Sequence, residues 1–194
     1  MNPLLNIFRK KQPGFTFVEL TIVFTIFIAL ATIFVTSQQQ ARRSSSLRIA
    51  SDTTQSVLRQ MQNNVLSGEL YSESSLTPAR DYGIKFLSGG ASYTSFVEEA
   101  ATSNYKALET VNFDQKITFT NATVLSGGVS QGATSVEIRF FPPYGEIRVT
   151  AKSGSTTLFT EAKNVVVTFR LSYSGTSQYR QITVDGLSGR ISEF

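Results

Sequence analysis

Residues Phe15 to Thr36 read FTFVELTIVFTIFIALATIFVT, and this apolar stretch decides how the rest of the chain can be arranged. Glu19 carries the only charge in the stretch. At 1.5 Å per residue, a helix of this length measures roughly 33 Å, which matches the hydrocarbon core of a bilayer. Arg9, Lys10 and Lys11 precede the stretch and no acidic residue does. The positive-inside rule therefore predicts a cytoplasmic N-terminus and a single membrane crossing.

The helix is expected to continue beyond the apolar stretch, because no Gly or Pro occurs between Thr36 and Gly68. After the polar run of residues 37–40, apolar and small residues recur at spacings of three and four, which is typical of a helix with one buried face. These residues are Leu47, Ala50, Thr54, Val57, Leu58, Met61 and Val65. The sequence predicts one helix from about Phe15 to about Leu66, membrane-spanning over 15–36 and amphipathic over 37–68.

From Glu69 onward the apolar pattern changes to a period of two, and turn residues become frequent. This pattern is typical of antiparallel strands with one buried face. The alternating segments are Tyr82–Phe86, Ile117–Phe119, Val136–Phe140, Ile147–Val149, Val165–Leu171 and Ile182–Val184. We therefore predict a globular β-rich domain over residues 69–194. The expected fold class is α+β, with the second half of the helix covering an antiparallel β-sheet.

The composition removes several classes of chemistry. The chain contains no His and no Cys, so it lacks the commonest general base, the thiolate nucleophile and the commonest zinc ligands. No catalytic constellation stands out among the remaining residues. We expect no enzymatic activity, no metal site and no cofactor.

The net charge of +4 does not indicate a nucleic-acid-binding surface. Three of the 18 basic residues are Arg9, Lys10 and Lys11, and residues 69–194 hold 11 basic and 12 acidic side chains. The positive charge is therefore concentrated ahead of the apolar stretch and along the helix. General binding to nucleic acid is not expected.

Residues 9–20 read RKKQPGFTFVEL and combine a basic leader, a helix-breaking Pro-Gly pair and a carboxylate inside an apolar run. Pro13 and Gly14 disfavour helix at the point where the apolar run begins. The segment resembles the prepilin leader motif of type IV pilins and type II secretion pseudopilins. The resemblance implies the type IV pilin fold and removal of residues 1–14 as a leader peptide. It also implies cleavage between Gly14 and Phe15 by prepilin peptidase, and N-methylation of Phe15.

Glu19 needs a physical reason, because a carboxylate in a membrane-spanning helix costs about 2.5–3.5 kcal/mol. One interpretation is a helix start favoured by the macrodipole, which contributes about 0.3–1 kcal/mol. In pilins, the resemblance implies that this glutamate contacts the new amine of a neighbouring subunit, here at Phe15, during assembly. The larger magnitude of the burial cost favours the second interpretation.

An ordinary secretory signal peptide is the alternative explanation of the N-terminus. Leu20–Ala31 would then be the hydrophobic region, and cleavage would follow Ala31 in the small-residue sequence Ala29–Ala31. Against it, Glu19 directly adjoins the apolar run and the amphipathic stripe continues beyond Thr36. The prepilin interpretation is favoured for these reasons.

Two later segments, residues 136–147 and 182–191, are similar to the sheet regions of GspH/FimT-type minor pilins and pseudopilins. The resemblances imply a structural subunit of a type IV pilus or a type II secretion-like filament. Expected partners are prepilin peptidase, other pilin or pseudopilin subunits and an assembly platform. The expected location is the bacterial cytoplasmic membrane, followed by a periplasmic or extracellular filament. The alternative is a filament-borne binding module, an adhesin or a DNA-uptake minor pilin, with exposed tyrosines such as Tyr93, Tyr105, Tyr144, Tyr173 and Tyr179 as stacking residues.

Overall fold

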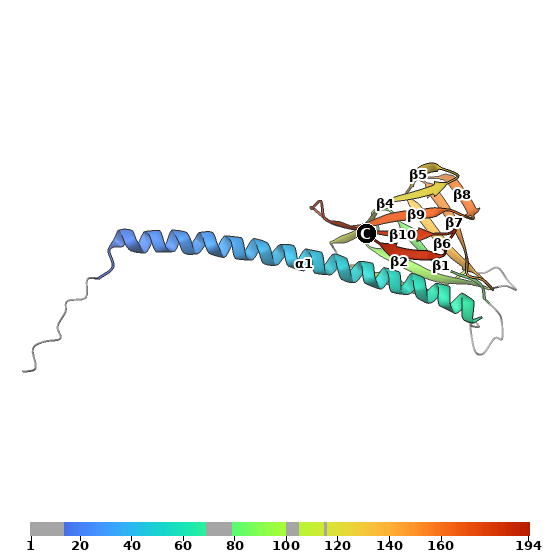
Figure 1. Ribbon diagram of the computed structural model, residues 1–194, viewed down its shortest axis with the longest axis horizontal. Coiled ribbons are helices and arrows are strands. Elements are labelled where there is room, and N and C mark those ends of the chain that lie inside the picture. The colour runs from blue at the N-terminus through green and yellow to red at the C-terminus, as the bar shows by residue number, and fades with distance from the viewer. Residues whose placement is uncertain (1–13, 69–78, 100–104, 115) are drawn as a thin grey trace, which may run out of the picture. The chain divides into compact units, whose positions relative to one another are not determined.

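The computed structural model describes residues 14–68, 79–99, 105–114 and 116–194, which form one long helix followed by strands (Figure 1). The chain divides into two compact units at the boundary between Arg42 and Arg43, so the helix belongs partly to each unit. The α+β class and the long apolar N-terminal helix agree with the sequence prediction.

Helix α1 runs unbroken over Phe17–Ser67 and passes through the polar residues 37–40 without interruption (Figure 1). It begins two residues after the predicted start and ends one residue beyond the predicted end. Gly68 terminates it with a φ of 66°, and the Gly68 N–H donates a hydrogen bond to the Val65 carbonyl at 3.3 Å. A left-handed residue after the last turn is the usual way in which a helix ends at glycine.

The strands form two antiparallel sheets instead of the single sheet that the sequence predicted. The six-stranded sheet has the order β3-β2-β1-β6-β7-β8. Its strands are β1 (Ala79–Leu87), β2 (Ser92–Glu99), β3 (Tyr105–Asn112), β6 (Ser135–Phe141), β7 (Glu146–Ser153) and β8 (Thr156–Ala162). Alternation shows which face of a strand is buried but not which strand it pairs with, so the division into two sheets was not accessible from the sequence.

The five-stranded sheet has the order β11-β10-β9-β4-β5. Its strands are β4 (Ile117–Ser126), β5 (Val129–Ala133), β9 (Val166–Tyr173), β10 (Tyr179–Asp185) and β11 (Arg190–Glu193). The six predicted segments lie in β1, β4, β6, β7, β9 and β10. Strands β2, β3, β5, β8 and β11 were not predicted.

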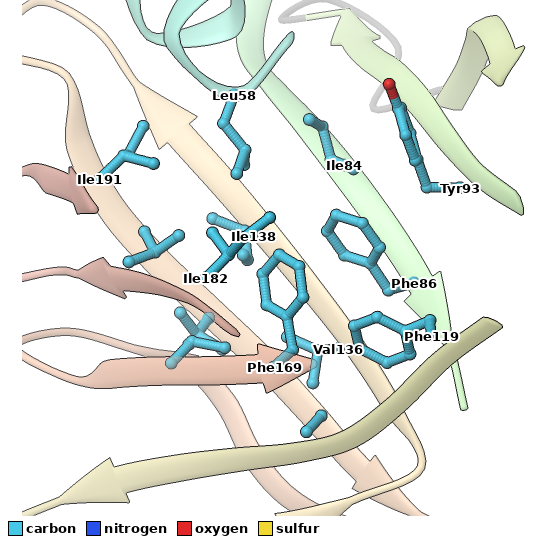
Figure 2. Packing of buried hydrophobic residues seen from close by; sticks show 14 of the residues in the cluster. Leu58, Ile84, Phe86, Tyr93, Phe119, Val136, Ile138, Phe169, Ile182 and Ile191 are labelled. Carbon is cyan, nitrogen blue, oxygen red and sulfur yellow. The ribbon is translucent and has the colours of Figure 1, made fainter. Parts of the chain in front are cut away.

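The inner faces of the two sheets meet in one hydrophobic core (Figure 2). The ring of Phe86 on β1 stacks on Phe119 of β4 with centroids 5.0 Å apart, and lies 4.7 Å from the ring of Phe169 on β9. The alternating apolar residues that predicted these strands are therefore the residues that join the two sheets.

The second part of α1 closes this core. Leu47, Ala50, Thr54, Leu58, Met61 and Val65 are buried, and Val57 is half-buried, as the spacing predicted. Figure 2 shows Leu58 reaching toward Ile138, with Ile84 and Ile191 on either side. Complete burial of one such leucine stabilises a fold by about 1.5–3 kcal/mol. This helical segment is therefore an integral part of the domain.

Candidate functional site

Gly14 and Phe15 form the first candidate site, at the start of the described chain. Both are exposed, with Phe15 at 83% of its maximum, and no atom lies within 4 Å of where a Cβ on Gly14 would stand. Helix α1 does not begin until Phe17, so the Gly14–Phe15 bond lies outside helical structure. A protease needs a bond that is accessible and free of helical structure, and this bond meets both requirements. Arg9, Lys10 and Lys11 lie outside the described residues.

Thr16 and Glu19 form a reciprocal cap at the first turn of α1. The backbone N–H and the hydroxyl of Thr16 both donate hydrogen bonds to Glu19 Oε2 at 2.8 Å. The N–H of Glu19 in turn donates to Thr16 Oγ1 at 3.2 Å. This is a capping box, in which the side chains at the N-cap and at the third helical position satisfy each other's backbone donors.

The capping box gives Glu19 a local role that the sequence analysis did not assign. Sequence reasoning considered the helix dipole and missed Thr16, although the Thr-x-x-Glu spacing before an apolar run is a recognisable capping signal. Among the described residues, the Glu19 carboxylate accepts hydrogen bonds from Thr16 and not from Phe15. The contact with Phe15 of a neighbouring subunit stays a prediction.

Residues 17–42 of α1 are exposed throughout, although most side chains up to Val35 are apolar. The helix is long and apolar enough to span a membrane. Its threonine hydroxyls bond to the helix itself: those of Thr21, Thr25 and Thr32 donate to the carbonyls of Phe17, Thr21 and Ile28 at 2.8 Å. Polar groups that are satisfied within the helix suit an environment without water.

Most of the tyrosines considered as stacking residues already contact other side chains of the domain. Tyr93 is buried, and desolvation by burial raises its pKa to about 12. The rings of Tyr105, Tyr173 and Tyr179 lie beneath guanidinium groups, at 4.7 Å, 5.8 Å and 4.4 Å from Arg139, Arg43 and Arg170. Tyr105 and Tyr179 nevertheless keep about half of their surface exposed, and Tyr144 is 88% exposed. The three exposed tyrosines come from β3, from the turn between β6 and β7, and from β10.

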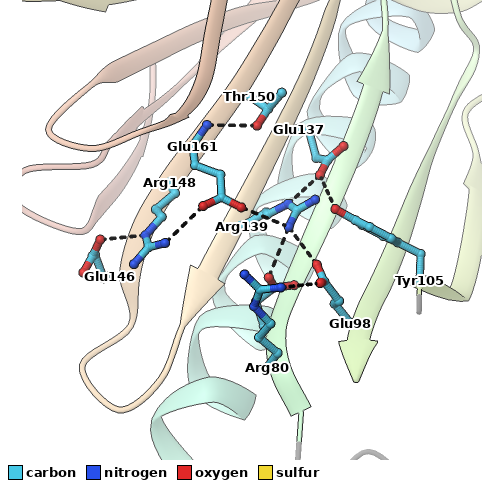
Figure 3. Close-up of polar contacts among 10 residues, drawn as sticks. Arg80, Glu98, Tyr105, Glu137, Arg139, Glu146, Arg148, Thr150 and Glu161 are labelled. Atoms are coloured by element: carbon cyan, nitrogen blue, oxygen red, sulfur yellow. Dashed lines mark hydrogen bonds and ion pairs between the residues drawn. The ribbon is translucent and has the colours of Figure 1, made fainter. Parts of the chain in front are cut away.

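A second cluster surrounds Arg139 on the outward face of the six-stranded sheet (Figure 3). Arg139 Nη1 lies 2.8 Å from Glu98 Oε2 and 3.3 Å from Asp81 Oδ2, and its Nε donates to Glu137. Glu161 approaches the same Nη1 at 3.6 Å. The four carboxylates come from β2, β1, β6 and β8, so one arginine connects four strands.

Aromatic rings and close packing keep the centre of this cluster, Arg139, Glu98 and Asp81, away from water. The Arg139 side chain is 9% exposed, Glu98 4% and Asp81 0%. The guanidinium lies over the rings of Tyr105 at 4.7 Å and Phe96 at 5.7 Å. Phe96 lies against Gly83 so closely that a Cβ there would stand 2.3 Å from its ring. Gly83 therefore lets the ring cover this part of β1.

Glu161 links the Arg139 cluster to a more exposed group on β7. It approaches Arg139 and also accepts a hydrogen bond from Arg148 Nη1 at 3.2 Å. Glu161 has a left-handed backbone, with a φ of 46°, a conformation that is costly for a residue other than glycine. Hydrogen bonds from Lys163 and Arg148 lower the pKa of the neighbouring Glu146.

The described residues contain no cluster of three or more His, Asp or Glu side chains suited to hold a metal ion. Comparison with known proteins found no family model, no curated protein and no solved structure that matches this chain.

Proposed function

We propose that this chain is a structural subunit, a minor pilin or pseudopilin, of a type IV pilus or a type II secretion-like filament. Prepilin peptidase cleaves it between Gly14 and Phe15, and the apolar part of α1 first holds it in the cytoplasmic membrane. The same helical segment then packs with other subunits in the filament. The domain from Arg43 onward faces the outside of the membrane.

One observation carries the proposal: an exposed, non-helical Gly-Phe bond stands directly before a helix whose first 26 residues, 17–42, are all exposed. The apolar part of this surface, residues 17–36, is long enough to span a membrane and is not left in water. A lipid bilayer covers it before assembly, and neighbouring helices cover it afterwards. A protein that only needed an anchor would not require a cleavage site ahead of the anchor.

Glu19 has two separable tasks in this proposal. Within one chain its carboxylate caps α1 through Thr16. In the filament its charge pairs with the Phe15 amine of a neighbouring subunit, where a charge-assisted contact is strongest because water is excluded. Glutamine at this position retains the capping function but lacks the charge. The two tasks therefore predict different outcomes for Glu19→Gln.

The test expresses the parent, Glu19→Gln, Glu19→Ala, Thr16→Val and Thr25→Val in a host that assembles the filament. Thr25→Val is the matched control, because Thr25 bonds only to a carbonyl within the helix. Mass spectrometry gives the mature N-terminus, and the amount of each variant in sheared filaments gives its incorporation.

We expect all five proteins to begin at Phe15. Both Glu19 variants should be missing from filaments, whereas Thr16→Val, which loses about 1 kcal/mol of capping, should be incorporated like the control. Normal incorporation of Glu19→Gln combined with loss of Thr16→Val would limit Glu19 to capping. A parent chain that begins at Thr32 would mean signal-peptide cleavage and would contradict the proposed function itself.

A further inference from the structure

Asp81 is the most completely enclosed charged residue in the Arg139 cluster. Its side chain has no exposed surface, and its Oδ1 has no hydrogen-bond partner among the described residues. Only Oδ2 is engaged, by Arg139 Nη1 at 3.3 Å. A buried carboxylate with one unsatisfied oxygen is a costly arrangement, because an ionised group needs donors at both oxygens once water is removed.

Asp81 and Glu98 both accept a hydrogen bond from the same nitrogen atom, Nη1 of Arg139. Glu98 Oε2 lies 2.8 Å from Arg139 Nη1, on the atom that Asp81 also contacts. Glu98 is the better placed of the two, because Arg80 Nη1 also donates to its Oε1 at 2.7 Å. When two carboxylates share one donor, the carboxylate with fewer hydrogen bonds takes up a proton first.

The charges that face Asp81 from the surrounding strands are acidic on balance. Glu98 on β2, Glu137 on β6 and Glu161 on β8 lie around Arg139, which is the most buried cation of the cluster. Of the other two arginines, Arg80 on β1 is half-exposed, and Arg148 on β7 also pairs with Glu146. Tyr105 on β3 contributes an aromatic ring above Arg139 and no charge at neutral pH.

We propose that Asp81 is a proton-binding site that makes the domain more resistant to unfolding in mildly acidic medium than at neutral pH. Protonation of Asp81 removes a buried negative charge that has only one hydrogen bond from Arg139. It also turns one oxygen of the carboxyl group into a donor within a cluster of acceptors. Arg139 stays paired with Glu98, Glu137 and Glu161, so the connection between the four strands is retained. The inference does not depend on the proposed filament.

The electrostatics agree with the geometry. Desolvation by burial, which outweighs the attraction of Arg139, raises the pKa of Asp81 from 3.8 to about 6. A carboxyl group whose pKa is higher in the folded than in the unfolded chain binds more protons when folded. The folding equilibrium therefore shifts toward the native state as the pH falls from about 7 toward 4. This increase in the pKa corresponds to about 100-fold in the folding equilibrium constant between full ionisation and full protonation of Asp81.

The test is a carboxyl NMR titration of the full chain in a nonionic detergent, with ¹³C-labelled aspartate, between pH 3 and 8. The chain has four aspartates, Asp52, Asp81, Asp114 and Asp185, so four carboxyl signals are expected. Asp52 and Asp114 are exposed, and hydrogen bonds from Ser188 and Leu187 lower the pKa of Asp185. One signal should titrate near pH 6, and it should be missing from Asp81→Asn. If all four aspartate signals had titration midpoints below about pH 4.5, the proposal would be overturned.

Two further measurements use variants. The parent and the exposed control Asp114→Asn should melt a few degrees higher at pH 5 than at pH 7, and Asp81→Asn should lose most of this difference. Burial also raises the pKa of Glu137, which contributes in the same direction in all three proteins. In Glu98→Gln the high midpoint should fall, because a nearby negative charge has been removed. An unchanged midpoint in Glu98→Gln, or a lower melting temperature of the parent at pH 5, would contradict the shared-donor arrangement.

Discussion

The two parts of α1 have the same backbone geometry and opposite relations to solvent. In residues 17–42 every side chain is exposed, whereas in residues 43–67 the side chains at three- and four-residue spacing are buried in the domain core. Apart from Glu19, the first part is apolar or weakly polar all round as far as Thr36 and then polar over residues 37–40, whereas the second part has a single apolar face. A helix with one apolar face can be covered by its own domain, but a helix that is apolar all round requires lipid or other helices.

The second part of α1 is stabilised by contacts within the chain, whereas the first part depends on contacts with its surroundings. The core contains five apolar residues of α1: Leu47, Ala50, Leu58, Met61 and Val65. No residue of 17–42 belongs to that core. The domain from Arg43 onward should therefore fold without the first part of the helix, and substitutions in the first part should not change its stability.

The largest expected effect comes from removing the second part of α1. A fragment of residues 43–194 should be a soluble monomer with cooperative unfolding in the absence of detergent. A fragment of residues 69–194 loses the five core residues, whose burial contributes several kcal/mol, comparable with the whole stability of a small domain. It should aggregate. Size-exclusion chromatography and circular dichroism during urea titration distinguish these states, and cooperative unfolding of the shorter fragment would show that the helix is dispensable.

A single leucine in each part of α1 gives a finer comparison. Leu58→Ala should lower the free energy of unfolding by about 2–5 kcal/mol, because it leaves a cavity between the two sheets. Leu30 is 61% exposed, so Leu30→Ala should change the same quantity by less than about 0.5 kcal/mol. Both are measured on the full chain in nonionic detergent by urea denaturation, using the tyrosine circular dichroism of the domain. Equal losses in the two variants would mean that the first part also stabilises the domain.

The strands show which structural features were accessible from the sequence. All six predicted segments lie in strands with neighbours on both sides, where one face is buried and alternation is strong. Four of the five strands that were not predicted, β3, β5, β8 and β11, are the edges of the two sheets. Residues Tyr105–Thr110 of β3 are all exposed, so no alternation marks that strand. In β2, Phe96 is buried on one face and Val97 on the other, and a bulge follows Ser95.

The candidate sites also differ in how far they could be predicted from the sequence. Gly14, Phe15 and Glu19 were found from a local motif, and the partner Thr16 was readable from the spacing of a capping box. The Arg139 cluster was not predictable, because Asp81, Glu98 and Glu161 come from three strands and occupy outward positions that are normally solvated. The Arg139 guanidinium that joins these carboxylates lies over the rings of Phe96 and Tyr105. Those rings belong to two strands that the sequence pattern did not reveal.

The smallest expected effect compares one substitution at two glycines. Gly145 has a φ of 66°, and a Cβ there would stand 3.3 Å from the Leu66 side chain at the end of α1. Gly145→Val should lower the free energy of unfolding by about 1–3 kcal/mol, because a β-branched residue is strained in the left-handed region. Gly145→Asn should lower it less, since asparagine tolerates this conformation.

Gly14→Val should leave the stability of the domain unchanged, because no atom lies within 4 Å of the Cβ position and Gly14 precedes α1. Its effect should instead be on processing. If the proposed cleavage between Gly14 and Phe15 is correct, a branched side chain at the scissile bond should leave uncut precursor in the membrane. Urea denaturation and mass spectrometry on the same preparations separate the two effects. A stable but uncut Gly14→Val protein beside a cut but destabilised Gly145→Val protein would assign the first glycine to recognition and the second to folding. A normally processed Gly14→Val protein would remove the main reason for placing the cleavage at this bond.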